Sequence, residues 1–287
     1  MNTFVEALSV EFLKARRSLL PGLTLLGISL APLMGGLFMK ILLDPAWAAR
    51  FGALTTKAQA SAAGANWPTY LGLLTQATAI GGSILFSIII TWLFGREYSD
   101  RTVIDLLALP ISRTTIVLAK FALALGWSVG LTIWLYGLGL GIGGLLGLPQ
   151  WSESLFWSAT ARLAATAGLT MLVITPLAWV ASAGRGYLPP IGMLFLLAFL
   201  AQVLAALGLG PYFPWSVPAL VSGAAGPEAQ ALGPESYVLV LLTGAIGVIG
   251  TVIWWQVADQ PAGSSPRQRK RHQTALTSDK SVPYTGG

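Results

Sequence analysis

The stretch FGREYSDRTVIDLLALPISRTTIVLAKF, residues 94–121, decides the fold, because it is a short charged segment between two long uncharged ones. No Asp, Glu, Lys or Arg occurs in residues 71–95 or in residues 121–152. Each of these stretches is longer than the roughly 20 apolar residues that a helix needs to cross a bilayer. The charged segment is therefore expected to be a short water-exposed connection between two membrane spans, and a contact surface for another molecule.

The composition excludes an ordinary soluble globule. The chain has 287 residues, of which 54% are hydrophobic and 10% are charged, whereas a soluble protein carries about 25% charged residues. Mean hydropathy is +0.70. There is no cysteine, which excludes disulfides, zinc–thiolate sites and thiol chemistry. The single histidine, His272, lies in a basic C-terminal tail and is interpreted as a solvated residue.

The hydropathy pattern predicts six membrane-spanning helices and a helix before them. We place the spans at residues 19–43, 71–95, 115–147, 155–183, 188–209 and 236–258. Residues 2–17 form an amphipathic pattern in which Phe4, Leu8 and Phe12 recur every four residues. Such a helix should lie in the membrane interface, either as a plain anchor or as a functional contact. Because this region contains Glu6 and Glu11, it does not resemble a cleavable signal peptide.

The distribution of positive charge predicts the orientation. With the N-terminus in the cytoplasm, all but four of the 17 Lys and Arg residues fall on the cytoplasmic side, the exceptions being Lys40, Arg50, Lys57 and Arg162. The fold class is therefore expected to be all-α: a polytopic membrane protein of six helices with both termini inside. Residues 1–258 form a single transmembrane domain, and residues 259–287 form a disordered basic tail. Lys40, Lys120 and Arg162 stand near span ends, where their side chains can extend to the lipid headgroups.

One outer segment is unusual. Residues 210–235, GPYFPWSVPALVSGAAGPEAQALGPE, contain five prolines and cannot form a regular span. The segment is either re-entrant or interfacial, capping the outer mouth, or a disordered loop with aromatic anchors.

Glycines recur along two of the spans. Gly139, Gly143 and Gly147 are spaced four apart in the third span, and Gly244 and Gly247 stand in the last. Small residues let helices approach closely in lipid. These positions are therefore expected to serve intramolecular packing or a subunit interface.

The charged segment itself reads as a short helix parallel to the membrane. Asp100 is a candidate N-cap for a helix that starts at Arg101, and Pro110 would end it. Arg101 and Asp105 are spaced to form a surface ion pair. A stiff helix joined to two spans can transmit force, whereas a flexible loop cannot.

Several kinds of chemistry lack residues in this sequence. There is no G-x-x-x-x-G-K-[ST] phosphate loop. No acidic residue lies near the centre of a span, as proton-coupled carriers usually require. No catalytic set is visible at either membrane face. Sodium coupling through backbone carbonyls stays open, because it needs no charged residue. The chain is therefore expected to be neither an enzyme nor a pump that holds its own ATP.

The charged segment resembles a pattern in the permease subunits of type-2 ABC exporters, in particular the bacitracin-resistance-like branch. The matching positions are Glu97, Tyr98, Thr102, Leu106, Leu107, Pro110, Ser112, Arg113 and Lys120. The aromatic run Trp254–Trp255 leading to Asp259 is also similar to the C-termini of that family. Arg101 departs from the pattern, since many members have Gly there.

The resemblance implies how the chain is powered. In this family the loop after the second span is a coupling helix that docks into a separate ATPase subunit. The partner, not this chain, would hold ATP and Mg. Two permease subunits, identical or paralogous, work with two ATPases in the cell membrane, in contact with lipid and without nucleic acid. The coupling surface would comprise Glu97, Tyr98, Asp100, Arg101, Thr102, Asp105, Leu106, Leu107, Pro110 and Arg113.

The sequence alone leaves two other functions open. One is a carrier or channel that acts without a partner, for which Pro176 and Pro189–Pro190 are the only signs of broken helices. The other is a membrane scaffold or sensor that transports nothing. The uncharged spans favour amphipathic or apolar cargo, such as a peptide antibiotic or a lipid-like molecule, exported from the cytoplasm or the inner leaflet.

Overall fold

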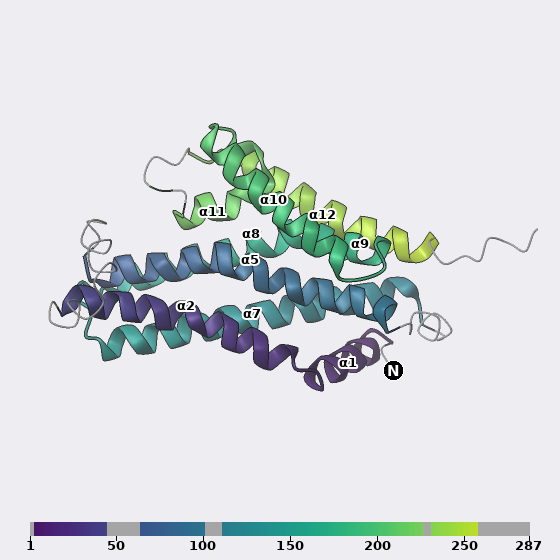
Figure 1. Cartoon of the computed structure of the whole chain (residues 1–287), viewed down its shortest axis with the longest axis horizontal. Coiled ribbons are helices and arrows are strands. Elements are labelled where there is room, and N and C mark those ends of the chain that lie inside the picture. Colours follow the sequence, from purple (N-terminus) through teal and green to yellow (C-terminus); the bar gives the residue numbers. More distant parts are fainter. Residues whose placement is uncertain (1–2, 45–63, 101–110, 225, 227–230, 258–287) are drawn as a thin grey trace, which may run out of the picture.

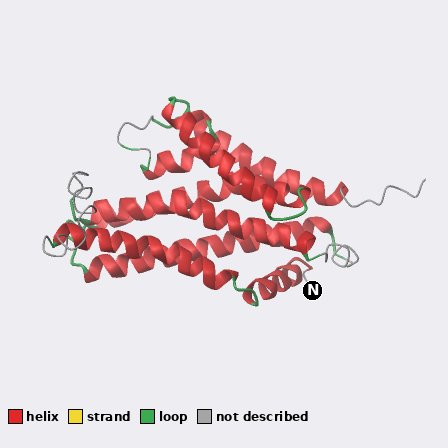
Figure 2. Cartoon of the chain, viewed as in Figure 1, coloured by secondary structure: helices red, strands yellow, loops and turns green. Residues whose placement is uncertain are grey.

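The computed structural model describes residues 3–44, 64–100, 111–224, 226 and 231–257. Every regular element among these residues is helical (Figure 2). The longer helices are α1 (Thr3–Arg16), α2 (Leu20–Leu43), α5 (Trp67–Ser99), α7 (Arg113–Leu145), α8 (Glu153–Ile174), α9 (Pro176–Ala183), α10 (Leu188–Ala206) and α12 (Pro234–Val257).

Six helical segments are long and apolar enough to cross a membrane. They are α2, α5, α7, the α8–α9 pair, α10 and α12, and their ends lie within a few residues of the predicted spans. Pro176 separates α8 from α9, because proline cannot donate the helical hydrogen bond at that position. Pro32 lies inside α2 without ending it.

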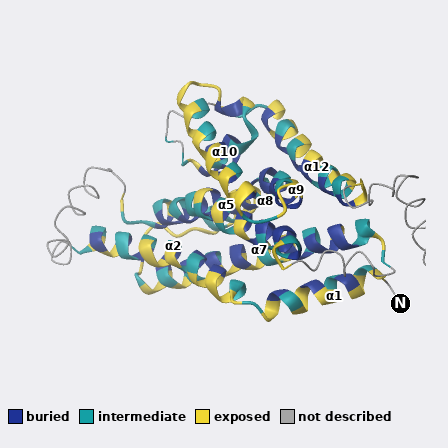
Figure 3. Cartoon of the chain, turned by 45° about the vertical axis from the view of Figure 1, so that its right-hand side comes forward, coloured by how far each residue is buried: buried dark blue, intermediate teal, exposed yellow. Residues whose placement is uncertain are grey.

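The helices form an elongated bundle around α5 (Figure 1). Helices α2 and α7 pack on one side of α5, and α8 and α9 pack on the other. In the apolar stretch that qualifies α5 as a membrane span, 56% of the residues are buried inside the bundle. In the corresponding stretch of α10, 17% are buried. Helices α10 and α12 lean away from the others at the end opposite to α1 (Figure 1), so α10 exposes much of its apolar surface (Figure 3).

The described part of the outer segment is ordered. Two 3₁₀ turns, η2 (Gly210–Tyr212) and η3 (Pro214–Ser216), lead into the short helix α11 (Val217–Ser222). Val217 and Ser222 are buried, and α11 packs against α5 and α8. Gly223 ends α11 with φ = 79°, a conformation that favours glycine. Residues 210–224 therefore match the re-entrant interpretation better than the disordered loop.

Four of the five singled-out glycines lie in helix contacts within this chain. Gly139 and Gly143 of α7 lie against Leu74 and Trp67 of α5. On α12, Gly244 lies against Leu172, and Gly247 against Thr175 and Pro176. The Thr175 hydroxyl donates a 3.1 Å hydrogen bond to the Gly244 carbonyl, so α12 seals the break between α8 and α9.

Gly147 is different from the other four. It lies beyond the end of α7, has φ = 62°, and its missing Cβ would face open space. Gly147 therefore enables the turn towards α8 and makes no helix contact within this chain.

Helix α1 turns two alanines and one carboxylate inward. Ala7, Glu11 and Ala15 are buried, whereas the apolar Val5, Phe12 and Leu13 are exposed. Because α1 packs on α7 through its small-residue face, its apolar face is left towards the surrounding lipid. This arrangement fits a helix at the membrane interface.

Candidate functional site

A cluster of four charged side chains joins α1, the end of α5 and the first turns of α7. Lys120 of α7 donates hydrogen bonds to Glu11 Oε2 of α1 at 2.9 Å and to Glu97 Oε1 of α5 at 3.0 Å. Lys14 of α1 donates to Glu11 Oε1 at 2.9 Å and to the same Glu97 oxygen at 3.0 Å. We call Glu11, Lys14, Glu97 and Lys120 the charged cluster.

The charged cluster is largely removed from solvent. Only 1% of the Lys120 side chain is exposed, and Glu11 and Glu97 are similarly buried. The third donor position of the Lys120 ammonium is satisfied by the Leu93 carbonyl at 2.9 Å. Lys120 thus does not extend to the lipid headgroups, and that expectation is wrong. Its ammonium turns inward because Glu11 and Glu97 place two buried carboxylates within hydrogen-bond distance, and a buried charge needs such a partner.

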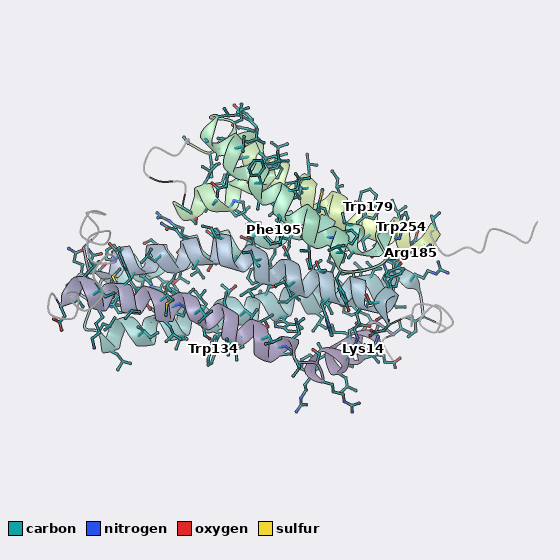
Figure 4. All side chains as sticks on the ribbon, viewed as in Figure 1. Lys14, Trp134, Trp179, Arg185, Phe195 and Trp254 are labelled. Carbon is teal, nitrogen blue, oxygen red and sulfur yellow. The ribbon has the colours of Figure 1, made fainter. Side chains whose placement is uncertain are left out.

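Lys14 is the solvent-facing member of the cluster (Figure 4). Burial alone lowers the pKa of the Lys14 ammonium, but attraction and hydrogen bonding to Glu11 and Glu97 outweigh burial and raise its pKa above the usual value. Lys14 is therefore charged at physiological pH, and the cluster holds two positive and two negative groups.

Local sequence explains why these groups meet. Glu11 and Lys14 are three residues apart on α1, so they share one face of the helix. Glu97 lies in the last turn of α5, and Lys120 lies two turns into α7. Since α5 leads into residues 101–110 and α7 leads out of them, the charged cluster ties both ends of that segment to α1.

Arg113 makes a second connection at the same end of the bundle. Its guanidinium donates to the Trp255 carbonyl at 2.9 Å and to the Gln256 carbonyl at 3.4 Å. These carbonyls belong to the last turn of α12. The negative end of the helix dipole lies there and stabilises the positive charge of the guanidinium. The start of α7 is thereby held on the end of α12.

The remaining coupling-surface residues are only partly described. Asp100 follows α5 and accepts a 3.0 Å bond from Arg96, while the Tyr98 ring packs edge-on to Trp255 at 6.3 Å. Ser112 caps α7 by accepting from the Thr115 amide. Six predicted coupling residues lie outside the described part of the chain, as does the tail 259–287: Arg101, Thr102, Asp105, Leu106, Leu107 and Pro110.

Sequence reasoning identified Glu97 but missed its three partners. The signal was present: Lys120 is the last charge before a long uncharged stretch, and Glu11 interrupts an otherwise small and apolar face of α1. A buried charge needs a partner, and Glu11 and Glu97 were the available acids. Among the described residues, no group of three or more His, Asp and Glu could hold a metal ion.

The helical bundle and the charged cluster define a multi-pass membrane protein with an organised inter-helix connection at one end. The chain belongs to the ABC-2 family of transporter proteins, whose family model matches residues 7–201, more than half of the chain. Membership makes it a transmembrane permease subunit, not an enzyme, and implies an ATPase partner. The resemblance seen in the charged segment is thus confirmed.

A particular relative is the bacitracin transport permease protein BCRB of Bacillus licheniformis. It is 28% identical over 183 residues, which cover 62% of this chain and 85% of that protein. No solved structure matches the chain.

Proposed function

We propose that this chain is the permease subunit of an ABC exporter that moves an amphipathic or apolar molecule out of the cytoplasm or inner leaflet. A separate ATPase subunit, which binds ATP and Mg, drives it through a coupling helix formed by residues 101–110. A second permease, identical or paralogous, completes the translocation path. The protein resides in the bacterial cytoplasmic membrane with both termini inside.

The charged cluster is the observation that carries this proposal. Residues 101–110 lie between the end of α5 at Ser99 and the start of α7 at Arg113, and the cluster joins α5, α7 and α1 within a few turns of those helix ends. Removing one member of a buried ion pair typically costs about 3–5 kcal/mol. A push on the segment would thus move the three helices together rather than deform one of them.

The burial of Glu97 refines its role. Its carboxylate is occupied by Lys14 and Lys120 and has 4% of its side chain exposed. We therefore assign Glu97 to positioning the coupling segment, and assign direct contact with the ATPase to the residues that follow Asp100.

The ends of the helices support the orientation. Helices α5, α9 and α12 end, and α2, α7 and α10 begin, at the end of the bundle that carries α1 (Figure 1). Most described cations lie there: Lys14, Arg16, Arg17, Arg96, Arg113, Lys120 and Arg185. Lys40 lies at the other end, and Arg162 lies in the half of α8 nearer that end. An excess of Lys and Arg marks the cytoplasmic side.

The substrate class rests on the relative and on the surface. The related permease is named for bacitracin transport, and the helices expose long apolar faces from which a membrane-embedded molecule could enter the path. We propose a membrane-active peptide antibiotic or a similarly amphipathic molecule as cargo.

Growth of a deletion strain on membrane-active antibiotics, bacitracin included, tests the substrate and the direction. Complementation with wild type should restore resistance only when the ATPase partner is catalytically intact. Full resistance with an ATPase-dead partner, or transport by the purified permease alone in vesicles, would refute the proposal and favour a carrier that acts alone.

Two variants test the division of roles. Leu106→Pro should abolish co-purification of the ATPase, because it breaks the proposed coupling helix. Glu97→Gln should retain at least part of that binding but lose most export. Glu235→Gln, at the far end of the bundle, is the matched control and should behave as wild type. Normal export by both Leu106→Pro and Glu97→Gln would overturn the assignment.

A further inference from the structure

We propose that a groove between α1, α2 and α7 binds one anionic phospholipid from the leaflet on the α1 side. The acyl chains lie in the groove, and the headgroup phosphate is held by Arg16. This lipid site is separate from the charged cluster, which lies on the inward face of α1.

The groove is large and apolar. Its volume is about 990 Å³, at the upper end of the range of roughly 300–1,000 Å³ that is typical of small-molecule sites. Phe12, Leu25, Leu123 and Leu131 line its walls, together with the ring of Trp127. It therefore offers hydrocarbon contact along a length of α7 and on both neighbouring helices.

Glycines keep the groove open. Gly22 of α2 and Gly126 and Gly130 of α7 line it, and a Cβ added at any of the three would meet no atom within 4 Å. Unlike Gly139 and Gly143, these glycines make no close helix contact. Their missing side chains leave room that a flexible acyl chain can fill.

Charge at one end of the groove selects the headgroup. Arg16 lines the groove, and Arg17 follows it at the exposed turn into α2. Neither arginine forms an ion pair with any described residue. The nearby carboxylate of Glu11 is already neutralised by Lys14 and Lys120. Guanidinium groups bind phosphate strongly and with defined geometry, so an apolar groove ending in Arg16 matches an anionic phospholipid.

A second copy of the chain fits this groove less well. Pairing two such grooves would place two Arg16–Arg17 pairs in one apolar interface, and like charges brought together without counter-ions are unfavourable. A phospholipid brings the opposite charge along with its hydrocarbon.

Position gives this lipid a consequence for transport. Helix α1 forms one wall of the groove and also supplies Glu11 and Lys14 to the charged cluster. Occupancy would hold α1 against α2 and α7, so the content of anionic lipid in the membrane should tune how firmly the three helices move together.

Trp127 provides a direct test. The full chain is reconstituted in vesicles that contain brominated phosphatidylglycerol or, at equal mole fraction, brominated phosphatidylcholine. The quenching measured in Trp127→Phe is subtracted from the quenching measured in wild type, and the difference is the quenching of Trp127. We expect about a fivefold preference for the anionic lipid, the fold-change corresponding to the ~1 kcal/mol that one basic residue contributes at a membrane surface.

Two variants locate the headgroup contact. Arg16→Gln should remove the preference while leaving quenching by phosphatidylcholine unchanged. Arg185→Gln, at the same end of the bundle but on the far side of α5 (Figure 4), should keep it. Equal quenching by the two lipids in wild type, or an undiminished preference in Arg16→Gln, would overturn the proposal. Protection of Trp127 from both lipids would show that protein or cargo covers the groove, and would overturn it too.

Discussion

Replacing Lys120 by methionine is expected to destabilise the protein strongly, although the two side chains are similar in length. The Lys120 ammonium contacts Glu11, Glu97 and the Leu93 carbonyl at 2.9–3.0 Å, with 1% of its side chain exposed. Methionine fills the space but leaves two buried carboxylates facing one remaining cation. The cluster changes from electrically neutral to a net charge of −1.

The magnitude follows from the partners that remain. Removing one partner of a buried pair costs about 3–5 kcal/mol. Lys14 still contacts both carboxylates, so we expect the lower end of that range. At the 2–4 °C per kcal/mol usual for chains of this size, the melting temperature should fall by at least about 6 °C.

Thermal unfolding of the purified protein in detergent measures this loss. Lys40→Met is the matched control, because it makes the same substitution at an exposed lysine at the other end of the bundle, and it should change the melting temperature little. Adding Glu11→Gln to Lys120→Met restores neutrality and should recover part of the loss. If Lys120→Met is no less stable than Lys40→Met, or if Glu11→Gln adds its full cost to that of Lys120→Met, the buried network does not hold these helices together.

Three further predictions follow from individual contacts. Gly247→Ala should destabilise the protein by about 1–3 kcal/mol through overpacking against Thr175 and Pro176, whereas Gly137→Ala, which meets open space, should not; equal melting temperatures would contradict this. Arg113→Gln should free the end of α12, seen as faster hydrogen exchange there, because two carbonyl contacts are lost; unchanged exchange would refute the link. Because the pKa of Lys14 is raised in the folded protein, its ammonium contributes stability that is fully present below the usual pKa of 10.5 and is lost as the pH rises through the higher folded value. The difference in unfolding free energy between wild type and Lys14→Met should therefore shrink only in strong alkali.

Most helix positions could be predicted because each span is defined by its own composition. In a bilayer every backbone polar group must be satisfied internally, so a long uncharged stretch has to be a helix. The interruption at Pro176 was likewise visible as a residue that cannot donate a hydrogen bond. Gly147 shares the four-residue spacing of Gly139 and Gly143 but lies beyond the end of α7. Spacing alone does not show where a helix stops.

The sequence by itself determined the number of candidate spans and, to within a few residues, their ends, because hydropathy is a local property of the chain. The type of transporter subunit came from the resemblance of the charged segment to a known family. Only the tertiary structure decided that Lys120 turns inward to Glu11 and Glu97, and that Arg113 holds the end of α12. These contacts join residues between 23 and 142 positions apart. Which buried charges meet depends on how the helices pack, and nothing within a single span specifies that choice.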